Sequence, residues 1–305
     1  MWSVLPELMI PSPIQELNLP LLKNKNLRIL VKRDDLIHPW VSGNKYRKLK
    51  YNLKLAIDQN FKTIFTFGGA FSNHLHATAG ACSLLGLKSV GIVRGEIDLN
   101  NPTLKFCIER GMTLIPTSRT AYKLKENGEE VKEILNKYPD AYIVPEGGTN
   151  RLALTGATEI VDEVKLQMEI MPEYIVLACG TGGTTAGLLS SKILTSKVIA
   201  FSALKSSHLE LEIKQLSDFK NAEKLTVNTD FHFGGYAKWD DVLIDFIHNF
   251  EKETGIPLEH VYNGKAMFGL MKLIQSDFFD SGSTICYIHT GGLQGKAGMI
   301  YMNGK

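Results

Sequence analysis

One stretch decides the fold: Tyr174-Ile175-Val176-Leu177-Ala178-Cys179 runs directly into Gly180-Thr181-Gly182-Gly183-Thr184-Thr185. The first six residues are apolar and include three strong β-formers, which predicts a buried strand. The glycines that follow predict a tight turn, after which a helical pattern begins. A strand, a glycine turn and a helix in this order are typical of an α/β domain with a mainly parallel sheet.

Similar apolar runs occur on both sides of this stretch, and helical patterns separate them. The predicted strands are 62–67, 89–94, 113–116, 142–145, 174–179, 198–202 and 284–289. Helical stretches end at Gly86 and Gly111, and glycine is the usual residue just past a helix. We expect two open α/β domains: a small domain of residues 48–153, and a large domain that combines residues 1–47 with 154–305.

Three further glycine-rich turns follow predicted strands. They are Gly68-Gly69-Ala70-Phe71-Ser72-Asn73, Glu146-Gly147-Gly148-Thr149-Asn150 and Thr290-Gly291-Gly292. In open α/β sheets, ligands bind outside the carboxyl ends of the strands. A single double glycine is usually a simple turn, but four such turns in one chain predict a shared ligand site.

The turn that follows residue 179 has the composition of an anion site. Glycine N–H groups at a helix start can face an anion, and threonine hydroxyls add further donors. The P-loop pattern GxxxxGK[ST] is missing, which excludes that class of nucleotide site. The dinucleotide fingerprint is incomplete, because Thr185 replaces its third glycine and no acidic residue follows about 20 positions later. The turn therefore fits a cofactor that carries a single phosphate.

Lys45 indicates what else that cofactor carries. Ser42-Gly43-Asn44 are turn and capping residues, and a helical apolar pattern follows them, so Lys45 is expected in the first turn of a helix. The helix dipole and burial both favour a neutral amine there, and a neutral amine attacks carbonyl carbon. The alternative is a solvated lysine in a basic run that extends to Lys54. Together with the phosphate turn, Lys45 predicts pyridoxal 5'-phosphate held as a Schiff base.

Composition limits the possible classes of function. The 305 residues are 44% hydrophobic and 22% charged, which is ordinary for a soluble protein. The net charge of +2 predicts binding neither to nucleic acid nor to an anionic membrane, and no apolar run is long enough for a membrane helix. No signal-peptide pattern is found at the N-terminus. Four dispersed cysteines without a CxxC pair predict reduced thiols and no metal site, so we expect a cytoplasmic protein.

Four motifs resemble the D-cysteine desulfhydrase and 1-aminocyclopropane-1-carboxylate (ACC) deaminase family. They are Ser42-Gly43-Asn44-Lys45 with the basic residues after it, Ser72-Asn73-His74, Gly180-Thr181-Gly182-Gly183-Thr184, and Val261-Tyr262-Asn263-Gly264-Lys265. Their order matches over nearly the whole chain. The resemblance implies a fold-type II pyridoxal phosphate enzyme, similar to the tryptophan synthase β-subunit, with the cofactor in the cleft between two domains. It also implies a homodimer and a small amino acid as substrate.

The resemblance implies roles for residues of the first two motifs. Lys45 would form the Schiff base and handle the substrate's α-proton, and Asn73 would hydrogen-bond the cofactor's 3-hydroxyl. Ser72 would lie over the substrate carbon, and His74 would face the substrate beside Ser72 and Asn73. Taken without the family, Ser72-Asn73 is an ordinary N-cap, and the two roles are compatible.

The resemblance also implies roles for residues nearer the C-terminus. The phosphate would be held by Gly180, Thr181, Gly182, Gly183 and Thr184. Tyr236 and Tyr262 resemble the catalytic tyrosines of the family. The alternative for any one tyrosine among the ten in this chain is simple packing.

Two positions bear on the substrate. A carboxylate beside the pyridine nitrogen strengthens the ring as an electron sink, and a hydroxyl leaves it weaker. The family's ACC deaminases have glutamate directly after the tyrosine that corresponds to Tyr262, and this chain has Asn263. Thr290 resembles the threonine that meets the ring nitrogen in the desulfhydrases. The sequence thus favours β-elimination from D-cysteine, giving pyruvate, ammonia and sulfide, over conversion of ACC to 2-oxobutyrate and ammonia.

Several alternatives stay open at this level. Phe71, His76 and Ala77 depart from the family pattern around Ser72, so the substrate contacts can differ. Asp34-Asp35 matches a family segment, for which an ion pair or a turn is the expected role. An idle metabolite-binding protein is disfavoured because Lys45, Asn73 and the phosphate turn are intact. An NAD-dependent oxidoreductase is disfavoured by the incomplete glycine fingerprint.

Overall fold

The computed structural model describes residues 5–303. The chain divides into two compact units. Unit 1 comprises the N-terminal residues up to Leu8, His38–Ala153, and the residues from Gln294 onward; unit 2 comprises Met9–Ile37 and Leu154–Leu293. None of the helices within 5–303 combines the length and the apolar character that crossing a membrane requires.

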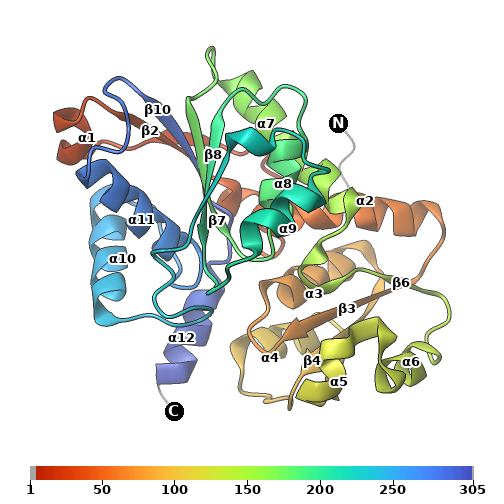
Figure 1. The fold of residues 1–305 in the computed structure, drawn as a ribbon. Helices are drawn as coiled ribbons and strands as arrows, with labels where there is room; N and C mark the ends of the chain where they lie inside the picture. The colour runs from red at the N-terminus through yellow and green to blue at the C-terminus, as the bar shows by residue number, and fades with distance from the viewer. Residues whose placement is uncertain (1–4, 304–305) are drawn as a thin grey trace. The chain divides into compact units, whose positions relative to one another are not determined.

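Unit 1 contains a four-stranded parallel sheet with the order β5-β4-β3-β6. Its elements are α2 (Gly43–Asp58), β3 (Thr63–Gly69), α3 (Asn73–Leu85), β4 (Lys88–Arg94), α4 (Pro102–Glu109), β5 (Met112–Thr117), α5 (Arg119–Leu124), η2 (Lys125–Asn127), α6 (Glu129–Leu135), β6 (Ala141–Ile143), η3 (Glu146–Gly148), the start of α7 (Arg151–Gln167), and α12 (Gly295–Asn303). Buried residues of α3 and α4 pack on one face of the sheet, and those of α5 and α6 pack on the other (Figure 1).

Unit 2 contains a six-stranded sheet with the order β1-β2-β10-β7-β8-β9, in which β1 alone is antiparallel. Besides most of α7, its elements are β1 (Ile14–Glu16), α1 (Pro20–Asn24), β2 (Arg28–Lys32), η1 (Asp34–Leu36), β7 (Tyr174–Cys179), α8 (Gly183–Ser190), β8 (Lys197–Ser202), α9 (Leu209–Leu216), η4 (Ala222–Lys224), β9 (Leu225–Asn228), α10 (Asp241–Thr254), α11 (Asn263–Gln275) and β10 (Thr284–Ile288). Figure 1 shows α10 and α11 on one side of this sheet and α7, α8 and α9 on the other.

Strand β7 explains why the sheet is covered on both faces. All six of its residues are buried. Tyr174, Val176 and Ala178 belong to the core cluster that includes α10 and α11, and the residues between them belong to the cluster of α7, α8 and α9. Because side chains alternate across a strand, a continuous apolar run is needed to fill both cores. The sequence expectation of a buried parallel strand at 174–179 is confirmed.

The other predicted strands are also present, and three strands escaped prediction. The strand expected at 142–145 is β6, which ends earlier, at Ile143, just before the Val144-Pro145 step into the next turn. The unpredicted strands are β1, β2 and β9. Strand β2 has basic residues at both ends, and its Lys32 is fully buried in an ion pair with Glu163, at 2.6 Å. The charged residues of β2 hide its strand pattern in the sequence, and Lys32 can be buried in the strand because Glu163 pairs with it.

The unit boundaries differ from the domain expectation at three segments, the first of which is residues 5–8, which belong to unit 1. We expected residues up to 47 to belong to the larger domain, but residues 38–47 belong to unit 1. The reason is local, since α2 runs unbroken from Gly43 to Asp58 and a single helix does not divide at residue 47. The C-terminal helix α12 also belongs to unit 1, where the Tyr301 ring contacts Phe71 and the Tyr301 hydroxyl donates to Asp98.

Candidate active site

Lys45 is the third residue of α2, as the sequence predicted. Ser42 is the N-cap residue without a side-chain capping bond, and no acidic residue lies in the first turn. Within residues 5–303 the structure gives the Lys45 amine neither a hydrogen bond nor an ion pair. Burial lowers the pKa of this amine to about 8. Lys45 therefore has a substantial neutral fraction near physiological pH, which a nucleophilic lysine requires.

Ser72 and Asn73 lie at the turn between β3 and α3. Ser72 is the N-cap residue, and its Oγ accepts a hydrogen bond from the N–H of Leu75 at 3.2 Å. Asn73 is the first residue of the helix. A Cβ atom at Gly68 would lie 2.6 Å from the Ser72 Oγ, so the close turn depends on that glycine. The expected N-cap is confirmed, and it holds a serine hydroxyl at the carboxyl end of a parallel strand.

His74 is buried, and its tautomer follows from its neighbours. The Thr66 hydroxyl lies 2.8 Å from the His74 Nε2 and donates its one hydrogen to the Val144 carbonyl, also at 2.8 Å. The Thr66 oxygen must therefore accept from His74, which places the ring proton on Nε2. The Nδ1 atom is left as a buried acceptor without a protein partner within the described chain. Burial, together with the charges of Lys45 and Lys48, holds the pKa of His74 well below 6.5, so the ring stays neutral.

The turn after β6 packs beside His74. The Lys48 amine donates to the Gly147 carbonyl at 3.0 Å and to the Thr149 Oγ1 at 2.8 Å. Gly148 has a φ of 70°, and a Cβ atom there would lie 3.1 Å from the His74 Cε1. Unit 1 thus brings α2, the β3–α3 turn and the β6 turn together at the carboxyl edge of its sheet.

In unit 2, the β7–α8 turn has the backbone geometry of an anion site. Gly182 is the N-cap of α8 with a φ of 78°, and no side chain caps the helix. A Cβ atom at Gly182 would lie 2.6 Å from Ile213, so only glycine fits. Thr184 and Thr185 are buried in the first turn. An uncapped helix start with buried hydroxyls fits one phosphate.

Two tyrosines lie beside this turn. The Tyr262 ring packs against Gly180, where a Cβ atom would lie 3.0 Å from its Cε1. Burial raises the pKa of Tyr262 well above 10, and Tyr236 and Glu259 add to the shift. The two tyrosine rings meet edge to face, with centroids 6.1 Å apart, and Tyr236 is 45% exposed. The structure therefore brings Tyr236 and Tyr262 together, with Tyr262 packed against the β7–α8 turn.

The Glu259 carboxylate lies at the N-terminal start of α11. Its carboxylate accepts the backbone N–H groups of Val261, Tyr262 and Asn263 at 2.6 to 3.1 Å. Burial raises the pKa of Glu259, while the N–H groups act in the opposite direction. The sequence carries only a weak signal for Glu259, an acid just before a helix start, and this residue was not among the predicted site residues.

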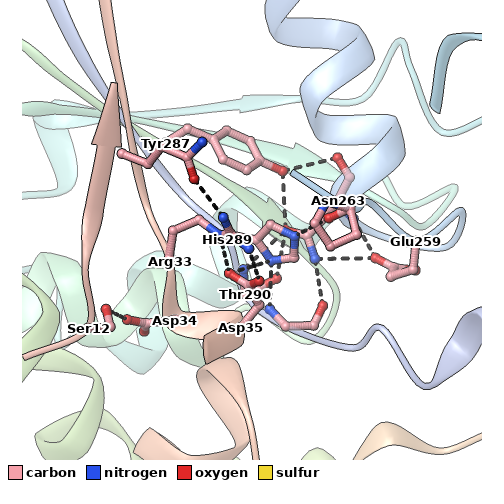
Figure 2. A network of polar contacts seen from close by, with 12 residues as sticks. Ser12, Arg33, Asp34, Asp35, Glu259, Asn263, Tyr287, His289 and Thr290 are labelled. Carbon is pink, nitrogen blue, oxygen red and sulfur yellow. Dashed lines mark hydrogen bonds and ion pairs between the residues drawn. The ribbon is translucent and has the colours of Figure 1, made fainter. Parts of the chain in front are cut away.

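Asn263 connects Glu259 to Thr290, as Figure 2 shows. The Asn263 Nδ2 donates to the Gly291 carbonyl at 2.8 Å and toward the Glu259 Oε1 at 3.3 Å. Its Oδ1 therefore faces Thr290, where it accepts the backbone N–H at 3.1 Å and lies 3.3 Å from the hydroxyl. The Tyr287 hydroxyl donates to the Asn263 carbonyl at 3.0 Å. Position 263 is thus built for a side chain that both donates and accepts.

The other residues labelled in Figure 2 make contacts with a structural role. Arg33 holds Asp35 through two hydrogen bonds of 2.9 and 2.7 Å, and the Asp35 side chain is fully buried. Asp34 accepts from the Ser12 hydroxyl at 2.6 Å. His289 contacts the Pro257 carbonyl through Nε2 at 2.7 Å. The expected ion pair at Asp34-Asp35 is confirmed for Asp35, and it supports the strand end that leads to Thr290.

Other titratable groups are buried without an evident chemical role. The four cysteines are free and buried, as predicted, and burial raises the pKa of Cys82, Cys107 and Cys286 to about 12. His76 stacks on Phe106 with ring centroids 3.8 Å apart. In the part of the chain that is described, no group of three or more His, Cys, Asp or Glu residues could hold a metal ion.

Comparison with known proteins identifies the family. The model of the pyridoxal-phosphate dependent enzymes matches residues 7–291. The chain belongs to this family. It is 34% identical over 321 residues to the bifunctional D-cysteine desulfhydrase/1-aminocyclopropane-1-carboxylate deaminase of Arabidopsis thaliana, a mitochondrial protein, covering 94% of this chain and 77% of that one. A Pyrococcus horikoshii protein provisionally named as an ACC deaminase is 33% identical over 279 residues, covering 88% of this chain and 85% of that one.

Solved structures agree with this assignment. The crystal structure of an ACC deaminase homologue superposes with a TM-score of 0.81 and 29% identity, covering 96% of this chain and 92% of that one. Threonine deaminase isoform 2 of Solanum lycopersicum superposes with a TM-score of 0.68 at 15% identity, covering 94% of this chain and 81% of that one, which shows the fold alone. The resemblance to the desulfhydrase and ACC deaminase family and the fold-type II architecture are confirmed.

The residues present fit pyridoxal phosphate, the cofactor of this family. The uncapped start of α8 fits its phosphate, and Lys45 is an unpaired amine with a lowered pKa, which fits its aldehyde. The chain is therefore a pyridoxal phosphate enzyme, and its substrate is a separate question.

Proposed function

We propose that this enzyme eliminates sulfide from D-cysteine. With water consumed, the balanced reaction converts D-cysteine to pyruvate, ammonia and hydrogen sulfide: the bond from Cβ to sulfur breaks, and the α-proton is removed. The observation that carries the proposal is the Asn263–Thr290 network, because it presents a neutral amide and a hydroxyl where a carboxylate would make a stronger electron sink.

Bound pyridoxal phosphate supplies a ring that stabilises negative charge at the α-carbon. In our proposal the N–H groups and hydroxyls from Gly180 to Thr184 hold its phosphate. Lys45 would hold the cofactor by its aldehyde carbon in the resting enzyme, and its Nζ, once released by the substrate's amine, would accept and return the α-proton. Thr290 would meet the ring nitrogen, and Asn73 would hold the 3-hydroxyl.

The substrate's carboxylate is assigned to the start of α3. Ser72 caps that helix, Asn73 is its first residue, and its positive dipole end favours an anion. Tyr236 and Tyr262 are assigned to the sulfur, where a hydroxyl can donate to the departing thiolate. The high pKa of Tyr262 keeps its hydroxyl protonated, which suits a donor.

His74 receives a narrower role than a general substrate contact. Its Nδ1 has a lone pair and no proton, so it can accept a hydrogen bond but cannot donate one to a carboxylate. The substrate's amino group is the donor that fits. The Thr66→Val variant, which frees the ring to change tautomer, should then raise the KM for D-cysteine.

The choice between substrates rests on charge at position 263. A glutamate or aspartate there could not donate to the Gly291 carbonyl and would add a second anion beside Glu259. ACC has no α-hydrogen, so opening its ring demands a stronger electron sink than elimination of a thiolate does. These two arguments favour D-cysteine.

ACC deaminase is the second candidate, supported by the names of the Arabidopsis and Pyrococcus relatives. The deciding experiment gives the purified, cofactor-loaded enzyme D-cysteine, L-cysteine and ACC in parallel. We expect sulfide and pyruvate from D-cysteine alone. Formation of 2-oxobutyrate from ACC without sulfide from D-cysteine would overturn the proposal and assign the enzyme to the second candidate.

A further inference from the structure

Lys265 is a buried lysine in a family motif to which no role has been given. It is the third residue of α11, and only 1% of its surface is exposed. Its amine donates to the carbonyls of His232 and Gly235 at 2.9 and 2.8 Å. A helix start is an unfavourable place for a cation, and burial also removes the water around the amine. The two carbonyls offset these costs by accepting its hydrogen bonds.

The segment that supplies those carbonyls has an unusual backbone. Phe233, Gly234, Gly235 and Ala237 all have positive φ values, between 51° and 112°. Two of these residues are not glycines, and side chains disfavour that conformation. Its local hydrogen bonds run from the Gly234 N–H to the His232 Nδ1, from the Gly235 N–H to the His232 carbonyl, and from the Lys238 N–H to the Gly235 carbonyl at 3.2 Å. Such a turn needs a tertiary contact to hold one conformation, and Lys265 provides two.

Tyr236 lies directly after the second of these carbonyls. Its ring faces the ring of Tyr262, and Tyr262 is the N-cap residue of the same helix that carries Lys265. One helix start therefore fixes one tyrosine through the backbone and the other through the Lys265 amine. Tyr236 is 45% exposed, so packing covers only part of it.

We propose that Lys265 is a positioning residue that holds the 232–237 turn so that the Tyr236 hydroxyl stays beside Tyr262. The inference rests on the proposed function only for the consequence in catalysis. The mechanical part, that the amine fixes the turn, is independent of the substrate.

The mechanical part is tested by proteolysis of the cofactor-loaded enzyme. Chymotrypsin cuts after exposed tyrosines, and cleavage after Tyr236 reports opening of the turn. Lys265→Met keeps the length of the side chain and removes the donors, and Lys272→Met on the exposed side of α11 is the matched control. We expect cleavage at Tyr236 to rise about tenfold in Lys265→Met and to stay unchanged in Lys272→Met. Equal cleavage in both variants would overturn the proposal.

The catalytic part is tested by a double-mutant cycle. If Lys265 acts through Tyr236, then Lys265→Met added to Tyr236→Ala should lower kcat no further than Tyr236→Ala alone. Additive losses would overturn the positioning role. Lys265→Arg keeps a cationic donor and should recover part of kcat and the protection of Tyr236. If Lys265→Met does not fold, Lys265→Gln carries both tests. Failure of all turnover on D-cysteine would contradict the proposed function, whereas the cleavage result would still decide the role of Lys265.

Discussion

Helices α2 and α11 each have a lysine in the first turn, but the two lysines differ in their hydrogen bonds. Lys45 and Lys265 are each the third residue of their helix, and burial lowers the pKa of each amine to about 8. Lys265 donates to two carbonyls, and Glu259 caps the N–H groups beside it. Among residues 5–303, Lys45 has no such bonds, and no acid lies in the first turn of α2. A lowered pKa alone thus does not distinguish a reactive lysine from a structural one; the difference lies in the hydrogen bonds.

The largest expected effect comes from removing the free amine. Lys45→Ala should lower sulfide release from D-cysteine by at least about 10³-fold, because nucleophile and base are lost together. Visible absorbance of the lysine-linked cofactor should vanish as well. Lys54→Ala, on the same helix and ion-paired with Asp58, is the matched control and should retain both. Turnover by the Lys45→Ala enzyme would end the claim that this lysine is the reactive one.

Removing the Glu259 carboxylate at the start of α11 should mainly lower the free energy of unfolding. In Glu259→Gln the three backbone N–H groups lose a charged acceptor, and the amide NH₂ faces them instead. We expect a loss of about 2–3 kcal/mol in the free energy of unfolding, measured by urea denaturation of the apoenzyme. The exposed Glu253→Gln is the control. A change below about 0.5 kcal/mol would mean that the dipole of α11 needs no carboxylate.

The pH dependence of cofactor capture can separate the two lysines. Only the neutral Lys45 amine reacts with the aldehyde, so the rate at which apoenzyme takes up pyridoxal phosphate should rise about tenfold per pH unit below pH 8 and level off above it. A lysine at its ordinary pKa would give a rate that climbs to about pH 10.5. Lys265→Gln should leave the midpoint unchanged, and a shifted midpoint would mean that the titrating amine was assigned to the wrong helix.

The smallest expected effects are on stability, where Lys45→Met and Lys265→Met should change the free energy of unfolding in opposite directions. Lys45→Met removes an unpaired buried amine, which below pH 8 is charged at a cost, so the apoenzyme should gain about 1 kcal/mol. Lys265→Met removes two charge-assisted bonds and should lose about 1–2 kcal/mol. For a lysine whose folded pKa is lowered, stability rises with pH between about 8 and 10.5, so the gain in Lys45→Met should shrink across that window. Thermal unfolding at pH 7 and pH 9.5 measures the change in stability of both variants. Changes of the same sign would contradict the difference between the two lysines.

Much of the architecture follows from local sequence. The apolar run at 174–179 and the glycines after it predicted the central strand and the turn that follows it, since a strand buried on both faces must be continuously apolar. The capping residues before Lys45 gave the helix start in the same way. Strand β2 escaped because its Lys32 is buried only by virtue of Glu163, which lies 131 residues away in the sequence.

What the sequence by itself determined is the order of strands and helices, the glycine turns at strand ends, and the lysine at the start of α2, because periodicity and capping are local. Only the tertiary structure decided how each group is used. Thr66 fixes the tautomer of His74 because the carbonyl of Val144, 78 residues away, takes its hydrogen. Lys265 is anchored because the 232–237 turn folds back onto α11. Hydrogen bonds between distant segments have no local signature, and they separate the free lysine from the held one.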